Sequence, residues 1–282
     1  MRKLAIVAMA LAVMAGSAFA TPLIGRNGAI GKPFQALGWA NFGYNQTAIG
    51  FDTAADKYVA LAADKVTKTT SCDVTLGLGL PGKLELDVVA PLAMKEQGTA
   101  KSSGLGDVVV YARYGFLQSA LLPVKAAMVL GANLPTADTT VPKAVRLGDK
   151  TIDIGIGAAV VTSKFFGFVG HARAGYWLNG KTDDTTKVGN MFEYMAVADY
   201  SLTKTLTPEL AVSGYTRAQT EYNGTPKSNS EVSQHVVNVL LMWKPISMLV
   251  IRPKVAFPLT SMSKGGSMAN WYGGLDVWVT FP

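Results

Sequence analysis

Alternation of apolar and polar side chains is the feature that most constrains how this chain can fold. In GLGDVVVYARYGF, residues 104–116, one alternate set is apolar and the other holds Asp107, Tyr111 and Arg113. Successive side chains of an extended strand point to opposite faces. One face of this segment therefore suits an apolar environment and the other suits water.

The same period of two recurs along most of the chain and predicts an all-β protein. In TIDIGIGAAVV, for example, Ile152, Ile154 and Ile156 alternate with Asp153 and glycines. Charge falls on the polar phase each time. We predict twelve strands, at residues 34–45, 70–80, 83–92, 105–116, 123–134, 150–162, 165–178, 190–202, 207–218, 232–244, 248–257 and 270–281.

The connections between these segments alternate in length. LPGK, QSALLP, SKF, KTLT and PIS are short, whereas AMKEQGTAKSSG, TADTTVPKAVRLGDK and NGKTDDTTKVG are long and polar. This layout is typical of an antiparallel transmembrane β-barrel with short periplasmic turns and long extracellular loops. An even strand number places both ends of the barrel sheet on the periplasmic side.

The first twenty residues predict a secretory signal peptide. Arg2 and Lys3 precede an apolar run, and Ala18-Phe19-Ala20 has the spacing of a processing site, so residues 1–20 would be removed. The run is shorter than the roughly 20 apolar residues of a membrane-spanning helix. No later segment is long and apolar enough either, although 49% of residues are hydrophobic. Since only helices and closed barrels satisfy their backbone groups in a bilayer, a barrel of the bacterial outer membrane is the remaining membrane structure.

Charge and cysteine content exclude other classes. The net charge of +7 falls to +5 when Arg2 and Lys3 are removed, and no basic stripe is present, so nucleic acid is not an expected partner. The single cysteine, Cys72, is interpreted as structural. A soluble β-sandwich also alternates, but its exposed faces would carry more charge than a chain with 16% charged residues supplies.

The final predicted strand, WYGGLDVWVTF, places Trp271, Leu275, Val277 and Phe281 on one phase. Its terminal aromatic resembles the signal by which the barrel-assembly machinery recognises bacterial barrels, although Pro282 follows it. Aromatic residues near other strand ends would suit the interfaces between membrane and water.

Motifs for catalysis, metals or cofactors are weak. Gly77, Gly79 and Gly82 have dinucleotide-binding spacing, but a strand follows where that motif requires a helix. His171 and His235 are the only histidines, and neither lies in a catalytic or ligand pattern. We therefore expect no enzyme activity, no metal and no cofactor.

Charged residues of both signs on the polar phase would face one another inside a closed barrel. Arg113 would find its partner on a neighbouring strand, with Glu85 or Asp87 as candidates that depend on the register. The predicted lumen-lining residues are Glu85, Asp87, Asp107, Tyr111, Arg113, Lys125, Asp153, His171, Arg173, Glu193, Asp199, Arg252 and Lys254.

Three segments resemble the MetA-pathway of phenol degradation family: VTLGLGLPGKLELDVVAPL, SGLGDVVVYARYGFL and VKAAMVLGANLPTADTT. The marks are Gly104, Gly106, Asp107, Tyr114 and the Leu134-Pro135 pair. The resemblance implies an outer-membrane channel, distantly similar to long-chain fatty acid transporters, that admits hydrophobic or aromatic small molecules. It implies no catalytic residue.

Three functions remain open from the sequence: a passive channel for small hydrophobic or aromatic compounds, a nonspecific porin, and a structural barrel that docks a partner protein. Met191, Met195 and Trp278 would contribute to an aromatic-compatible lumen. The expected organisation is a signal peptide at 1–20, an irregular segment at 21–33 that either plugs the lumen or lies outside it, and a barrel at 34–282. Outer-membrane lipid, the transported compound and the assembly machinery are the expected partners.

Overall fold

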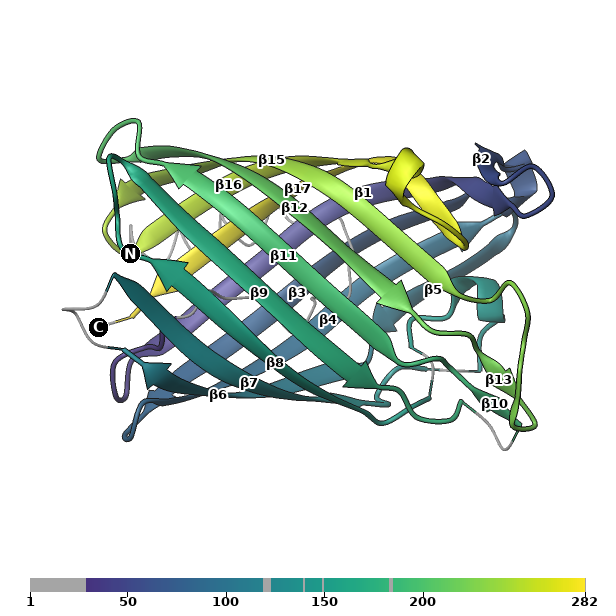
Figure 1. The fold of residues 1–282 in the computed structure, drawn as a ribbon, viewed down its shortest axis with the longest axis horizontal. Helices are drawn as coiled ribbons and strands as arrows, with labels where there is room; N and C mark the ends of the chain where they lie inside the picture. Colours follow the sequence, from purple (N-terminus) through teal and green to yellow (C-terminus); the bar gives the residue numbers. More distant parts are fainter. Residues whose placement is uncertain (1–28, 119–122, 139, 149, 183–184, 282) are drawn as a thin grey trace.

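The structure, a computed structural model, describes residues 29–118, 123–138, 140–148, 150–182 and 185–281. Within this part the chain forms a closed antiparallel barrel whose twelve strands are tilted to the long axis (Figure 1). Each strand overlaps one predicted segment, so the predicted fold class and strand number are confirmed. The barrel strands are β1 (Ala36–Asp52), β3 (Thr67–Leu80), β4 (Leu84–Gln97), β6 (Val108–Leu117), β7 (Val124–Leu134), β8 (Asp153–Thr162), β9 (Phe168–Leu178), β11 (Met191–Tyr200), β12 (Leu206–Arg217), β15 (Val232–Ile246), β16 (Leu249–Pro258) and β17 (Ser267–Thr280).

The barrel closes where its first and last strands pair. β1 and β17 are antiparallel neighbours from Leu37 opposite Thr280 to Gly50 opposite Ser267. This pairing carries β1 well past residue 45, where its predicted segment ends. Closure leaves no open sheet edge, which removes the unpaired backbone groups that an edge would present to lipid.

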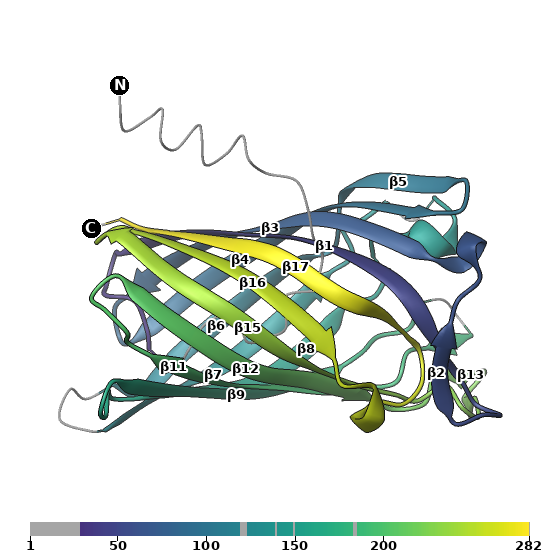
Figure 2. The same cartoon turned by 90° about the horizontal axis from the view of Figure 1, so that it is seen from above.

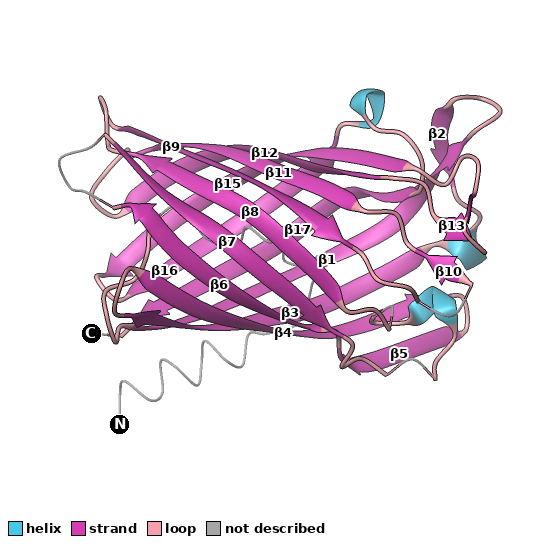
Figure 3. Ribbon diagram, turned by 60° about the horizontal axis from the view of Figure 1, so that its bottom comes forward, coloured by secondary structure: helices cyan, strands magenta, loops and turns pink. Residues whose placement is uncertain are grey.

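The two ends of the barrel differ (Figures 2 and 3). Short turns connect the strands at one end, here called the short-turn end, where β1 begins and β17 ends. The opposite, long-loop end carries all the additional elements. These are β2 (Lys57–Ala60), β5 (Ala100–Leu105), which extends β4 as a hairpin, a small sheet of β10 (Thr186–Lys187), β13 (Glu221–Tyr222) and β14 (Thr225–Pro226), and three short 3-10 helices at Ala63–Lys65, Lys143–Val145 and Thr260–Met262.

The barrel wall is apolar outside and polar inside. Leu130 and Ile154 keep 55% and 58% of their surface exposed, whereas the carboxylates of Glu85 and Asp276 are buried. A soluble sandwich would bury the apolar set and expose the charged one. This inverted pattern is the one a lipid-facing barrel requires. Among the described residues, no helix is long and apolar enough to cross a membrane.

The Gly77–Gly82 stretch runs from β3 through a turn into β4, so a strand follows the three glycines. Gly82 has φ of +77° in that turn, a conformation that suits glycine. Gly79 lies where a side chain would overlap the carbonyl of Lys32. These glycines therefore serve a turn and a close backbone approach.

The predicted signal peptide lies outside the described residues, as do residues 21–28 of the irregular segment. Residues 29–33 form no strand. The Gly31 N–H donates to Glu85 Oε2 at 2.7 Å, and the Ile30 N–H donates to Gln118 Oε1 at 3.3 Å. This part of the segment is thus tied to strand β4 and to the turn after β6.

Candidate functional site

Three cavities follow one another through the barrel. The outer cavity, about 860 Å³, lies at the long-loop end, the central cavity measures about 420 Å³, and the inner cavity, about 270 Å³, lies at the short-turn end. The outer and central cavities share five lining residues: Met191, Glu193, Arg217, Gln234 and Tyr272. The central and inner cavities also share five: Trp39, Arg173, Val197, Glu209 and Arg252. The shared walls place the cavities in series along the barrel.

The loop after β7 narrows the outer cavity because it folds inward. Val145 in this loop is fully buried, and the carbonyl of Arg146 accepts a hydrogen bond of 2.9 Å from Lys95 Nζ. Asp107 accepts the backbone N–H of Ala137 at 3.0 Å. The strand pairing with β4 is interrupted at Gly106 and Asp107, so β6 begins at Val108 rather than at the predicted residue 105.

Asp153, at the start of β8, makes further contacts with loops near the same part of the opening. Its carboxylate accepts hydrogen bonds from Asn133 Nδ2 at 3.0 Å and from the backbone N–H of Gly180 at 2.9 Å. Asp107 and Asp153 thus both bind loop backbone groups at the long-loop end. The two carboxylates therefore fix the positions of loops at this end of the barrel.

Of the three cavities, the central one has the largest apolar share of its lining surface. Methionines project from β11, small and branched aliphatic residues from β12, β15 and β16, and aromatic residues from β1, β12 and β17. These are Met191, Met195, Ala211, Val236, Leu240, Ala256, Trp39, Tyr215 and Tyr272. A chamber of this volume, with polar groups at its margins, has the character of a small-molecule site.

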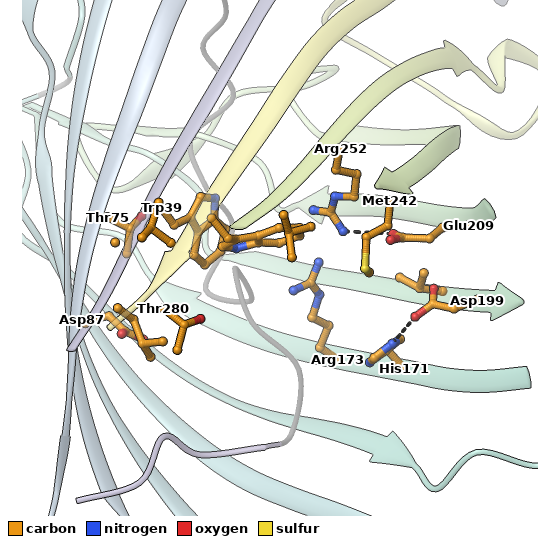
Figure 4. A pocket seen from close by; sticks show the side chains of 17 residues that line it. Trp39, Thr75, Asp87, His171, Arg173, Asp199, Glu209, Met242, Arg252 and Thr280 are labelled. Carbon is orange, nitrogen blue, oxygen red and sulfur yellow. Dashed lines mark hydrogen bonds and ion pairs between the residues drawn. The ribbon is translucent and has the colours of Figure 1, made fainter. Parts of the chain in front are cut away.

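The inner cavity is ringed by charge (Figure 4). Arg252 donates to Glu209 at 2.9 Å and to Asp276 at 2.6 Å, and its guanidinium lies 4.2 Å from the ring centre of Trp278. The same Asp276 accepts from Lys254 at 2.8 Å. Since the two acids are buried and each contacts a cation, the wall between the central and inner cavities is neutralised locally.

His171 and Asp199 form a second pair in the inner cavity, with His171 Nε2 and Asp199 Oδ2 2.5 Å apart. His235, in contrast, lies outside the barrel wall, where it contacts the hydroxyls of Tyr194 at 2.8 Å and Ser233 at 2.9 Å. Gly214 separates Tyr194 from His235 on the intervening strand, and a side chain there would collide with both. The two histidines therefore belong to different faces.

The predicted lumen-lining residues fall into two groups. Glu85, Tyr111, Arg113 and Lys125 line none of these three cavities. Glu85 and Arg113 form a buried salt bridge, and Tyr111 packs in an apolar cluster with Val89, Val129 and Trp177. The other nine residues line at least one cavity: Asp87, Asp107, Asp153, His171, Arg173, Glu193, Asp199, Arg252 and Lys254.

Six further charged residues line the cavities without having been predicted: Lys95, Arg146, Lys150, Glu209, Arg217 and Asp276. A sequence signal exists for three of them, because Glu209, Arg217 and Asp276 alternate with the outward residues of their strands. Arg146 belongs to a loop, where alternation carries no information. In the described part of the chain, no group of three or more histidine, cysteine or acidic side chains is arranged to hold a metal ion.

Comparison with known proteins agrees with this fold. The COG4313 outer membrane channel from Pseudomonas putida F1 superposes with a TM-score of 0.78 at 12% identity, covering 90% of this chain and 97% of that one. Two other barrels are more distant. The NanC porin superposes with a TM-score of 0.49 at 9% identity, covering 86% of this chain and 99% of that one. The CymD monoaromatic hydrocarbon channel superposes with a TM-score of 0.48 at 8% identity, covering 89% of each chain. No curated protein matches by sequence.

A family match covers most of the barrel. The family described as "Putative MetA-pathway of phenol degradation" matches residues 45–280, which run from within β1 to the end of β17. That range includes most of the residues that line the three cavities. On this match, together with the twelve-stranded barrel, the chain belongs to the "Putative MetA-pathway of phenol degradation" family.

Proposed function

We propose that this protein is an outer-membrane channel for passive uptake of small hydrophobic or aromatic compounds. The observation that carries the proposal is the series of three cavities, in which the central one combines methionine and aromatic side chains with charged residues. An aromatic solute would gain contact with methionine and aromatic side chains in the chamber. The charged ends would keep the path hydrated.

Two comparisons support the proposal. The Pseudomonas putida F1 barrel of the same fold is described as an outer membrane channel. The description of the family refers to phenol degradation, a pathway that begins with an aromatic compound. Assembly by the barrel-assembly machinery and contact of the outer wall with membrane lipid are parts of the same proposal, which assigns no catalytic step.

A nonspecific porin is the second candidate. The paired charges of the central cavity favour it, because Arg252 and Lys254 against Glu209 and Asp276 resemble the opposed charges of a polar ion path. A porin would pass small sugars as well as aromatic compounds, whereas an aromatic-compatible chamber would discriminate between them.

Solute uptake separates the two candidates. Proteoliposomes containing the folded barrel are challenged with benzamide and with glucose, and uptake by protein-free liposomes is subtracted. We expect benzamide to enter faster than glucose. Equal entry of both solutes supports the porin, and entry of neither contradicts both candidates.

A further inference from the structure

Three arginines mark the path through the cavities. Arg146 lines the outer cavity, Arg217 lines both the outer and the central cavity, and Arg173 lines both the central and the inner cavity. Arg217 therefore lies at the junction of the outer and central cavities, Arg173 lies beside the salt-bridged Arg252 at the junction of the central and inner cavities, and Arg146 lies nearer the entrance.

These arginines differ from the other interior cations in having guanidinium groups that protein acceptors do not saturate. The Nε atom of each is buried and has no hydrogen-bond partner within the described part of the chain. None of the three takes part in a salt bridge between described residues, and the hydrogen bond from Arg173 Nη2 goes to the sulfur of Met195. A sulfur atom is a weak acceptor for a cation.

The nearby acids are engaged elsewhere. Glu209 and Asp276 bind Arg252, Asp199 binds His171, and Glu193 accepts from Trp177 Nε1 at 3.1 Å. At the long-loop end Asp107 and Asp153 bind loop backbone N–H groups. Guanidinium groups with a buried, unpartnered Nε and no matching carboxylate are candidate sites for an anion, since an unsatisfied buried polar group is costly.

An aromatic side chain accompanies the arginine at each junction. Tyr272 lies with Arg217 between the outer and central cavities, and Trp39 lies with Arg173 between the central and inner cavities. Figure 4 shows the side chains of Arg173 and Arg252 extending toward one another from different strands. A guanidinium binds a carboxylate through two parallel hydrogen bonds, and a tyrosine or tryptophan ring contacts an aromatic ring.

We propose that Arg146, Arg217 and Arg173 bind aromatic carboxylates in succession and so conduct them through the barrel. The inference rests on the proposed function and names its substrate class. Several binding sites of moderate affinity favour conduction, because an ion must dissociate from each site as readily as it binds there. The apolar chamber between Arg217 and Arg173 accommodates the ring while the carboxylate passes from one arginine to the next.

The test measures the reversal potential of single channels in a gradient of sodium benzoate. Wild type is compared with Arg217→Gln, Arg173→Gln and the double variant. The matched control is Lys101→Gln, which removes a positive charge paired with Glu96 on the exposed β4–β5 hairpin, away from the three cavities. We expect the double variant to lower the benzoate-to-sodium permeability ratio by about tenfold or more, because a charge-assisted hydrogen bond is lost at each junction. The control should leave the ratio unchanged.

Folding and specificity are followed in parallel. Heat-modifiable migration reports the folded fraction, and Arg217→Lys keeps the charge if the glutamine variant does not fold. Arg217→Lys should retain anion preference but favour benzoate over chloride less than wild type does, because lysine lacks the planar guanidinium. Uptake of neutral benzamide should match wild type in the Lys101→Gln control, and in the arginine variants it should fall less than the uptake of benzoate, because benzamide carries no negative charge for a guanidinium to bind.

Three results would overturn the inference. If the benzoate-to-sodium permeability ratio is unchanged in the double variant and benzamide is still taken up, the arginines do not bind benzoate. The proposed function is then unaffected. An equal loss for chloride and benzoate shows a general anion path and removes the aromatic specificity. Failure of folded wild type to conduct either benzamide or benzoate rejects the proposed function and the inference with it.

Discussion

Glu85 on β4 and Arg113 on β6 are register partners whose side chains form a salt bridge with exposed fractions of only 0% and 3%. The sequence left Glu85 and Asp87 as alternative partners, and the register selects Glu85. Glu85 also accepts the backbone N–H of Gly31, so the pair links the segment before β1 to the barrel wall. Since neither side chain lines the three cavities, the pair serves the fold more directly than conduction.

Arg113→Ala should therefore lower barrel stability and leave single-channel current unchanged. Removal of one partner leaves the Glu85 charge buried and costs about 3 to 5 kcal/mol. The measurement is the folded fraction by heat-modifiable migration across a urea series. Replacing both residues, as Glu85→Gln with Arg113→Met, should recover part of the loss. A normal folded fraction with altered current would instead assign Arg113 to the conducting path.

Adjacent positions on β15 test which face meets lipid. Val239 is exposed on the outer wall, whereas its neighbour Asn238 lines the central cavity. Val239→Arg should reduce assembly, because arginine facing lipid near the bilayer midplane costs roughly 2 to 4 kcal/mol. Asn238→Arg should assemble well, since water in the cavity can hydrate the charge. Comparable membrane levels of the two variants would contradict the assignment of faces.

Filling the central cavity should block aromatic uptake. Ala211 is buried against this cavity, and Val212 beside it faces outward. Ala211→Phe adds a ring to the chamber, so benzamide uptake should fall several-fold, while Val212→Phe adds the same ring to the outer wall and should leave uptake unchanged. Proteoliposome uptake at matched folded protein provides the comparison. Undiminished uptake by Ala211→Phe would place the path elsewhere.

Loss of the Asp107 carboxylate should loosen the inward-folded loop after β7. Asp107→Ala removes the acceptor of the Ala137 N–H and should make trypsin cleavage at Arg146 or Lys150 about tenfold faster, with a larger single-channel conductance. Asp138→Ala is the control, because the Asp138 carboxylate bonds only to Thr140 within the same exposed loop. Similar cleavage rates for both variants would show that Asp107 does not hold the loop.

The sequence by itself determined the strands and their faces. Alternation is a local property, because each side chain's direction follows from its neighbours along the strand. All twelve strands, and the inward position of Glu193 and Arg252, could therefore be assigned from short segments. The lengths of the connections likewise determined which end carries the loops.

Tertiary structure alone decided which charges meet and where the cavities lie. Arg252 contacts Glu209 from 43 residues away, across the strand that separates them, and Lys254 Nζ donates to Asn41 Oδ1 through the closure of the barrel. Such contacts depend on register and closure, which pairing over the whole sheet determines and no short segment encodes. The inward fold of the loop that carries Arg146 is likewise set by contacts with distant strands, because a polar loop has no period from which its direction could be read.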